Sequence, residues 1–269
     1  MFAKNRCYVG PRIDHALGGD ARHVHVVLCA QSHRQCHDYQ HGDPRDPAGG
    51  TRVIDASSAH RTSEGWCYGF PELVGAERVA DARRVSNPGC YPTGFLALVA
   101  PLVKAGLLPA DWPFTVNAVS GFSGGGKPLI ERFRSEGAPA FRAYGYDLAH
   151  KHLGEMQAHA GLDHPVIFAP SVVPAYRGML VEVPLHLGAM VATPHADDLW
   201  AALADFYADA RLVKVHGSAP VGELLLETGA EWDSVYSGML TCAQLADTKP
   251  ESLVRLAGTR QPGARYHHA

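Results

Sequence analysis

Several features that mark particular classes of protein are scarce or absent in this sequence. Six cysteines are spread through 269 residues, and no two of them form a Cys-x-x-Cys pair. This spacing excludes a disulfide-stabilised scaffold and predicts reduced thiols. The sixteen histidines form neither an HExxH motif nor a quartet with cysteine, so we interpret them as mainly surface residues and predict no metal site.

Long apolar runs and an excess of charge of one sign are also missing. No apolar stretch reaches the roughly 18 residues that a membrane span requires, and residues 1–20 lack the apolar core of a signal peptide. Lys and Arg number 24 against 27 for Asp and Glu, giving a formal net charge of -3. Such a balance creates no field that attracts nucleic acid or an anionic membrane. We therefore expect a cytoplasmic protein that binds a small molecule, with neither nucleic acid nor membrane as a partner.

What the sequence does contain is 46% apolar residues, arranged as alternating strand and helix patterns. The β-branched apolar runs at 24–30 and 51–59 predict buried strands. Residues 114–133 predict a strand, a glycine-rich turn and a helix, and residues 164–187 predict two strands around a loop. Residues 195–215 predict an amphipathic helix followed by a strand. The alternation indicates the α/β class, with a domain boundary near residues 86–92.

The stretch VSNPGCYPTGF (85–95) places a lone cysteine, Cys90, between a Pro-Gly turn and Pro92, which opens an apolar run at helical spacing. Unpaired N–H groups and the positive dipole end of a helix N-terminus favour a thiolate, which lowers the pKa of a thiol placed there. The pattern predicts a nucleophile beside backbone donors that can stabilise an oxyanion. The alternative is a small buried residue at the start of a helix.

A nucleophilic cysteine needs an acid/base partner, and AHKHLGEM (149–156) offers two imidazoles. Imidazole titrates near neutrality, so His150 or His152 can move a proton to or from a developing alkoxide. Glu155 follows His152 by three residues and can orient it on one side of a helix. The alternative is a solvated surface turn, and a metal site would lack its third and fourth ligands.

The glycine-rich stretch SGFSGGGKP (120–128) imitates a phosphate-binding loop, because Gly121 to Lys127 fit the pattern GxxxxGK. Pro128 stands where the magnesium-binding Ser or Thr would be, which argues against a nucleoside triphosphate site. A turn that approaches another anion or a flat cofactor ring fits better, with a plain flexible turn as the alternative.

Five segments in the same order resemble the N-acetyl-gamma-glutamyl-phosphate reductases of arginine biosynthesis. The similarity covers roughly 60% of the chain. The segments are VIDASSAHRTSEGWCYGFPEL, VSNPGCYPTG, NAVSGFSGGGK, AYGYDLAHKHLGEM and YRGMLVEVPLHL.

The resemblance implies a homo-oligomeric, NADP-dependent reductase with two domains. Residues 1–89 would form a partial Rossmann-like NADP-binding domain with a parallel sheet, incomplete at its N-terminus. Residues 90–245 would form a mixed α/β substrate domain of the glyceraldehyde-phosphate dehydrogenase C-terminal type. Residues 246–269 would return to the first domain or stay loose.

The resemblance also implies roles for individual residues. Cys90 would attack N-acetyl-gamma-glutamyl phosphate and release phosphate, and His152 would be the acid/base for reduction of the resulting thioester to N-acetylglutamate semialdehyde. Tyr144 and Arg177 would take a substrate carboxylate or phosphate. The implied substrate-binding residues are His150, Glu155, Tyr144, Arg177 and Asn87. The implied cofactor-binding residues are Ser120, Gly121, Ser123, Gly124 and Ser57.

The two ends of the chain depart from this family. No strand followed by a GxxGxxG-type turn occurs in residues 1–50, and the family's glycine-rich C-terminal helix is not recognisable. These departures keep open a second hypothesis, a non-catalytic binding or assembly subunit that does not hold NADP. Related chemistry on aspartyl phosphate is a third.

Overall fold

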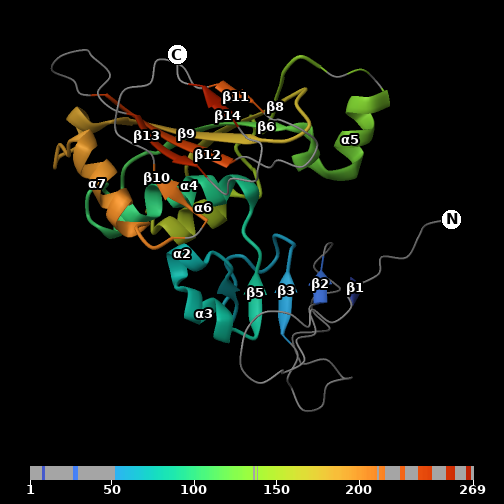
Figure 1. Cartoon of the computed structure of the whole chain (residues 1–269), viewed down its shortest axis with the longest axis horizontal. Helices are drawn as coiled ribbons and strands as arrows, with labels where there is room; N and C mark the ends of the chain where they lie inside the picture. Colours follow the sequence, from blue (N-terminus) through green and yellow to red (C-terminus); the bar gives the residue numbers. More distant parts are fainter. Residues whose placement is uncertain are drawn as a thin grey trace. The chain divides into compact units, whose positions relative to one another are not determined.

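The computed structural model describes residues 52–135, 137, 139–210 and 212–215 in full, together with the backbone of six further strands. The chain divides into two compact units, Met1–Gly89 and Cys90–Ala269, which are drawn in Figure 1. Both units combine helices with parallel or mixed sheets, which confirms the α/β class. The expected absence of a glycine turn in residues 1–50 lies outside the described residues, except for two short strands.

Unit 1 is built on a five-stranded sheet with the order β1-β2-β3-β5-β4. Its elements are β1 (Tyr8–Val9), β2 (Val27–Cys29), β3 (Val53–Asp55), β4 (Cys67–Tyr68), α2 (Pro71–Val74), α3 (Ala76–Asp81) and β5 (Arg84–Ser86). Strands β2, β3, β5 and β4 are parallel, and β1 is antiparallel to β2. The two runs predicted as strands from their β-branched residues are therefore neighbours, and their carboxyl ends share one edge.

Unit 2 contains a seven-stranded mixed sheet with the order β10-β13-β12-β9-β6-β8-β7. Its strands are β6 (Thr115–Gly121), β7 (Arg142–Ala143), β8 (Ile167–Val173), β9 (Met179–His186), β10 (Lys214–Val215), β12 (Tyr236–Ala243) and β13 (Leu253–Ala257). Strand β6 is parallel to β8 and antiparallel to β9. A separate two-stranded sheet pairs β11 (Leu225–Glu227) with β14 (Arg265–His267).

The helices of unit 2 lie mainly on one face of this sheet, as Figure 1 shows. They are α4 (Cys90–Lys104), α5 (Gly126–Ser135), α6 (Leu153–Ala160) and α7 (Ala196–Phe206), with short 3-10 turns η1 (Phe122–Gly125) and η2 (Leu187–Ala189). Helix α4 is the centre of the core, because it contacts β9, β12, α6 and α7. Its side chains Phe95, Leu96, Leu98, Val99 and Leu102 are fully buried. Burying each such side chain stabilises the fold by about 1.5–3 kcal/mol. This packing fixes the position of the helix and of its first residue, Cys90.

The C-terminal segment 246–269 contains two strands, β13 and β14. Strand β13 pairs with β12 and β10 of unit 2. Its short apolar run, LVRLA, suffices for a strand but is too short to produce a clear periodicity in the sequence. No helix in the described part of the chain is long and apolar enough to cross a membrane.

Candidate active site at the start of helix α4

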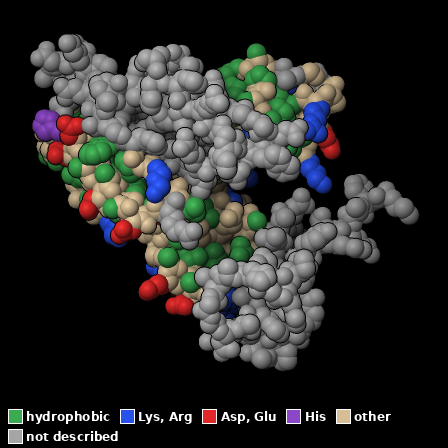
Figure 2. Space-filling view, viewed as in Figure 1, with side chains coloured by type: hydrophobic (Ala, Val, Ile, Leu, Met, Phe, Trp, Pro, Cys, Tyr) green, Lys and Arg blue, Asp and Glu red, His purple; other side chains and the backbone are tan. Residues whose placement is uncertain are grey.

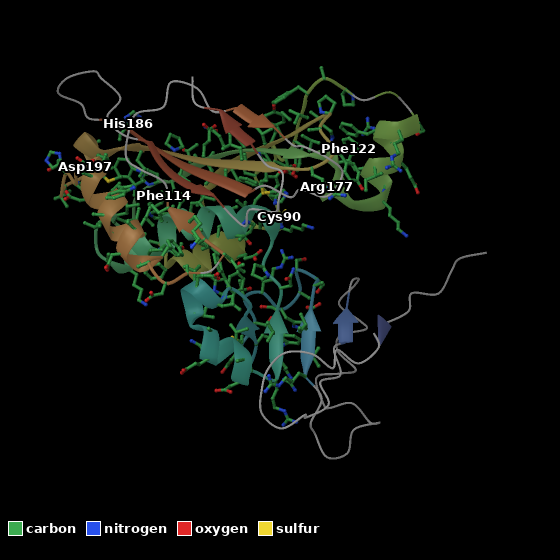
Figure 3. The ribbon with its side chains drawn as sticks, viewed as in Figure 1. Cys90, Phe114, Phe122, Arg177, His186 and Asp197 are labelled. Carbon is green, nitrogen blue, oxygen red and sulfur yellow. The ribbon has the colours of Figure 1, made fainter. Side chains whose placement is uncertain are left out.

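The candidate nucleophile, Cys90, is the first residue of helix α4. Its thiol is half-buried, and Figure 3 shows it at the N-terminal end of that helix. Pro92 and Tyr91, in the same first turn, are buried, and the turn contains no acidic residue. The backbone N–H groups of a helix's first turn point toward its N-terminal end, so this position has a positive potential. The structure thus provides the local geometry predicted from the Pro-Gly-Cys-x-Pro pattern.

Tyr91 connects this helix end to the sheet through a network of hydroxyl groups. Its side chain is 3% exposed, and its hydroxyl oxygen lies within hydrogen-bonding distance of Ser120 Oγ, at 2.8 Å, and of the Ser171 carbonyl oxygen, at 3.4 Å. The hydroxyl oxygens of Tyr144 and Tyr91 are 3.3 Å apart and share a hydrogen bond. Strands β6 and β8 and the segment after β7 therefore meet at one phenol next to Cys90.

Both candidate imidazoles lie beside this network. The ring centroids of His150 and His152 are 4.7 Å apart, and their centroids lie 6.4 and 6.1 Å from that of Tyr91. The backbone N–H of His152 donates to the ring Nδ1 of His150 at 3.3 Å. His152 directly precedes helix α6 and Glu155 lies in the first turn of that helix, and the two side chains are only 3% and 2% exposed. The structure brings His150, His152 and Tyr144 together around Tyr91, with Glu155 on the same helix.

Burial shifts the ionisation of several groups in this cluster. Desolvation raises the pKa of Tyr91 far above its ordinary value, and the neighbouring Tyr144 and Cys90 raise it further. Desolvation also raises the pKa of Tyr144, and the charge of Cys90 contributes. Burial lowers the pKa of His150, with the Lys151 ammonium as the second cause. The phenols thus stay neutral at pH 7, and Cys90 is within electrostatic range of Tyr144 as well as of its neighbour Tyr91.

The glycine-rich turn follows β6 and packs against the loop that carries Arg177. Gly121 donates its N–H to Gly178 O, Phe122 to Ala175 O, and Ser123 to Tyr176 O. Figure 3 shows Phe122 and Arg177 close to α5, and the Arg177 guanidinium lies 5.0 Å from the centroid of the Tyr176 ring. Ser120 and Gly121 are buried, whereas Gly124 is exposed and Ser123 is half-buried.

Helix α5, which follows this turn, carries the positive charge of the region. Figure 2 shows Lys and Arg side chains gathered at this end of unit 2, where Lys127, Arg132 and Arg134 are exposed. Phe133 on the opposite side of the helix is buried and stacks on Phe122 with ring centroids 4.8 Å apart. The helix therefore presents a basic face while its apolar face fixes the turn.

In unit 1, polar groups gather where β3 ends. The Asp55 side chain is fully buried and accepts bonds from the Ser57 N–H at 2.8 Å and the Ser57 hydroxyl at 2.7 Å. The Asn87 N–H donates to Asp55 O at 2.7 Å. The Arg61 Nε donates to Asn87 O at 2.9 Å. Ser57 and Asn87, both predicted from the family resemblance, therefore flank the carboxyl ends of β3 and β5.

Sequence reasoning missed three residues of these networks. Tyr91 and Ser171 lack any motif of their own, although Tyr91 directly follows the candidate nucleophile. Arg61, only 8% exposed, lies in one of the resembling segments, and no role was predicted for it. Its signal was a basic residue six positions after Asp55, the last residue of β3. Among the side chains that the structure places, no three His, Cys, Asp or Glu residues group as a metal site would require.

Comparison with known proteins connects this geometry to a family. The family model described as semialdehyde dehydrogenase, dimerisation domain, matches residues 90–228. N-acetyl-gamma-glutamyl-phosphate reductase 2 of Pseudomonas putida is 53% identical over 169 residues, which cover 61% of this chain and 54% of the relative. The N-acetyl-gamma-glutamyl-phosphate reductase of Burkholderia ambifaria is 50% identical over 176 residues, covering 64% of this chain and 55% of the relative. The chain spans about half the length of these curated relatives.

Solved structures agree at the level of the fold. Aspartate semialdehyde dehydrogenase II from Vibrio cholerae matches with a TM-score of 0.54 at 18% identity, covering 89% of this chain and 75% of that one. A probable aspartate-semialdehyde dehydrogenase from Pseudomonas aeruginosa matches with a TM-score of 0.52 at 17% identity, covering 87% of this chain and 73% of that one. At such identities the likeness concerns the arrangement of elements alone.

Proposed function

The chain belongs to the semialdehyde dehydrogenase dimerisation-domain family, and from this premise we propose that it reduces N-acetyl-gamma-glutamyl phosphate with NADPH. The products are N-acetylglutamate semialdehyde and phosphate. The single observation that carries the proposal is the position of Cys90 on the first turn of α4, within electrostatic range of a phenol that contacts an imidazole. Two curated relatives that are named N-acetyl-gamma-glutamyl-phosphate reductases, 53% and 50% identical to this chain, support the choice of substrate.

In the proposed reaction, the Cys90 thiolate attacks the acyl carbon and forms a carbon–sulfur bond while the carbon–oxygen bond to phosphate breaks. The N–H groups of the first helical turn stabilise the oxyanion during this attack. NADPH, when bound, supplies the hydride that reduces the resulting thioester. His152 donates a proton to the alkoxide that hydride addition creates and takes it back as the thiohemiacetal collapses to the aldehyde, which breaks the carbon–sulfur bond and restores the Cys90 thiolate; Glu155 orients that imidazole. Arg177 and Asn87 are the groups we propose for the anionic parts of the substrate.

The described residues fit a nicotinamide dinucleotide. In unit 1, β3 and β5 are parallel and end at one edge, which is where open α/β sheets bind such cofactors. Ser57 lies at that edge, and we propose it as a cofactor contact there. In unit 2, Gly124 is exposed and Ser123 half-buried, and we propose that this turn approaches the flat ring, with Ser120 and Gly121 holding the start of the turn.

We also propose that two copies associate through the face of the unit 2 sheet opposite α4. Val119 and Leu180 are paired across β6 and β9 and alternate with residues buried on the helix side. Ile167 on β8 adds an exposed apolar side chain to this face. The family's description as a dimerisation domain supports a second copy of this chain as the occupant.

A direct assay tests the reaction. The intact protein is mixed with NADP, phosphate and N-acetylglutamate semialdehyde, and the absorbance of reduced nicotinamide is followed. We expect the band to grow with wild type and to vanish with Cys90→Ser, while Cys67→Ser, the other described cysteine, retains activity. A flat trace from folded wild type would favour the hypothesis of a non-catalytic subunit. The lack of a glycine fingerprint in residues 1–50 is the observation that supports this alternative. Faster turnover of aspartate semialdehyde would move the assignment to aspartyl phosphate.

A further inference from the structure

One hydrogen bond at His150 determines which of its ring nitrogens carries the proton. The backbone N–H of His152 meets the ring Nδ1 of His150 at 3.3 Å. A backbone N–H can only donate, so Nδ1 must accept this bond with its lone pair. A neutral imidazole has a hydrogen on only one of its two nitrogens. The neutral ring of His150 is therefore the Nε2–H tautomer, and Nε2 is the nitrogen that a ligand can meet.

The chain and the core together hold the ring in this position. The Leu153 N–H donates to His150 O at 3.0 Å, which closes the turn just before α6 and directs the intervening peptide back toward the His150 ring. The ring also packs edge-to-face against Phe168 on β8, with centroids 5.1 Å apart and an interplanar angle of 76°. The buried ring of Tyr91 packs against it at 78°. Local backbone geometry and long-range packing thus support the same ring orientation.

The surroundings of His150 disfavour a second proton on the ring. Burial lowers the pKa of His150, the Lys151 ammonium lowers it further, and the Asp147 carboxylate opposes them as the smallest of the three causes. The phenols of Tyr91 and Tyr144 stay neutral at pH 7 and supply no anion. A proton on Nδ1 would also turn that nitrogen into a donor facing the donor N–H of His152. The half-buried ring therefore stays neutral at pH 7.

A neutral Nε2–H imidazole can donate a hydrogen bond but cannot take up a proton at Nε2, because that nitrogen has no free lone pair. Such a ring is suited to polarise a carbonyl or to bind an anionic oxygen without transferring a proton. The ring lies beside Tyr144, with centroids 5.8 Å apart, and Tyr144 is in range of the Cys90 charge. An oxygen bound by His150 is thus close to the reacting end of the substrate.

We propose that His150 binds an oxygen of the acyl phosphate group of the substrate through a neutral Nε2–H donor, and that proton transfer falls to His152 alone. The inference rests on the proposed function, since that reaction supplies the acyl phosphate. It separates the two imidazoles, between which the sequence offered no choice. The oxygen bound is either the acyl oxygen or a phosphate oxygen, and the kinetics below distinguish them.

A pair of variants tests whether His150 is a donor or an acid/base. Gln and Leu both lack the ring, but the Gln amide can offer an N–H near the position of Nε2. With N-acetylglutamate semialdehyde, NADP and phosphate, His150→Leu is expected to lower kcat/KM by about 100-fold or more. His150→Gln is expected to stay within about tenfold of wild type, because one neutral donor replaces another. Equal loss in the two variants would overturn the donor role.

The pH profile gives a readout that a loss of packing would not change. His150→Gln is expected to keep the midpoints of the wild-type profile of kcat/KM, because the titrating acid/base is still present. Disappearance of one limb of the profile in this variant would assign proton transfer to His150 and overturn the inference. His164→Leu, at an exposed histidine, is the control for the substitution and is expected to leave the rate and the profile unchanged.

The dependence on phosphate identifies the oxygen that His150 binds. If His150→Leu raises the KM for phosphate and retains kcat, the donor binds a phosphate oxygen. If it lowers kcat at an unchanged KM for phosphate, the donor binds the acyl oxygen as that oxygen gains charge. Both results support the donor role. A variant with both constants at the wild-type value would overturn it.

The tautomer itself is measured without turnover. Nitrogen-15 NMR of the imidazoles, with the His150 signals assigned from their loss in His150→Gln, is expected to show a protonated Nε2 and an accepting Nδ1 at pH 7. An imidazolium or an Nδ1–H ring at pH 7 in an active wild type would overturn the inference and leave the reductase function intact. A folded wild type that has the Nε2–H ring but does not turn over the semialdehyde would overturn the reductase function, and with it the substrate assigned to this donor.

Discussion

The backbone of Gly121 lies against the peptide that joins Tyr176 to Arg177, so closely that a Cβ on Gly121 would sit 2.6 Å from Arg177 N and 2.7 Å from Tyr176 O. Strand β6 ends at this contact, and the glycine-rich turn begins. This contact alone requires a glycine at position 121, whether or not a phosphate or a cofactor binds at the turn. It couples the turn to the loop that carries a proposed substrate-binding cation.

Gly121→Ala is therefore expected to lower the free energy of unfolding by roughly 2–3 kcal/mol or more, because the opposing atoms are backbone and cannot rotate away. Urea unfolding followed by tryptophan fluorescence measures the change. Gly124→Ala is the matched control in the same turn, since its Cβ would meet nothing closer than Ser120 Oγ at 3.9 Å. Equal unfolding midpoints for the two variants would contradict the close contact.

Substitution of two helical glycines by alanine is expected to change the free energy of unfolding in opposite directions. A Cβ at Gly94 in α4 would lie 2.8 Å from Val181 Cγ2 on β9, whereas a Cβ at Gly154 in α6 would meet nothing within 4 Å. We expect Gly94→Ala to destabilise the protein by about 1–3 kcal/mol through overpacking, and Gly154→Ala to stabilise it by up to about 1 kcal/mol through helix propensity.

A double variant checks the cause of the Gly94→Ala effect. Val181→Ala removes the methyl group that the new Cβ would strike, so the combined variant is expected to be more stable than the sum of the two single changes. Simple additivity of the two unfolding free energies would show that helix α4 and strand β9 are not in the contact described.

The pH dependence of His150 follows from its surroundings. Burial and the Lys151 ammonium both lower its pKa, so its NMR titration midpoint is expected below about 6.5. Lys151→Glu is expected to raise the midpoint, and Lys104→Glu, an exposed lysine at the far end of α4, is the charge-matched control. A midpoint unmoved by Lys151→Glu would contradict the electrostatic cause.

The sign of the linked stability change is fixed by the same shift. Above the unfolded-state pKa of about 6.5, His150 is neutral in both the folded and the unfolded state, so its shifted pKa does not affect the free energy of unfolding. As the pH falls below that value, the unfolded chain takes up the proton first, so the folded state loses stability toward the lowered folded-state pKa. His150→Gln is expected to flatten this part of the stability curve, measured by urea unfolding between about pH 5 and 8.

Local sequence patterns were enough to predict the elements that carry the site. A Pro-Gly turn before Cys90 and an apolar run after it predicted the start of α4, and the strand, turn and helix around the glycine-rich segment formed as expected. These features depend on neighbours within a few residues, which is why a single sequence reveals them.

The networks that complete the site could not be predicted from the sequence, because their partners are far apart along the chain. Tyr91 reads as one more apolar position of a helix, and its bond to Ser120 spans 29 residues and that to Ser171 spans 80. The position of β9 between β12 and β6 likewise follows from long-range pairing. Such hydroxyl networks form only once the strands have been placed, so the contacts of Tyr91 with Ser120 and Tyr144 could be described only from the structure.

The final prediction concerns the face of the unit 2 sheet opposite α4, where Leu180 lies beside Val119. If a second copy packs there, burial of an arginine at the centre of the interface leaves a charge without a partner, and this costs several kcal/mol. Leu180→Arg is thus expected to shift the protein to the monomer, as measured by light scattering after size-exclusion chromatography. Asp197→Arg on α7, an exposed position on the helix side of the sheet, is the control and is expected to keep the wild-type mass.

The pH dependence of association tests the same interface. Burial already raises the pKa of Glu182, which lies on the face opposite α4 together with Leu180. Closer packing by a second copy opposes ionisation of Glu182 further, so association is expected to weaken as the pH rises through that pKa. A monomeric wild type at all concentrations would contradict the assignment of this face as an interface.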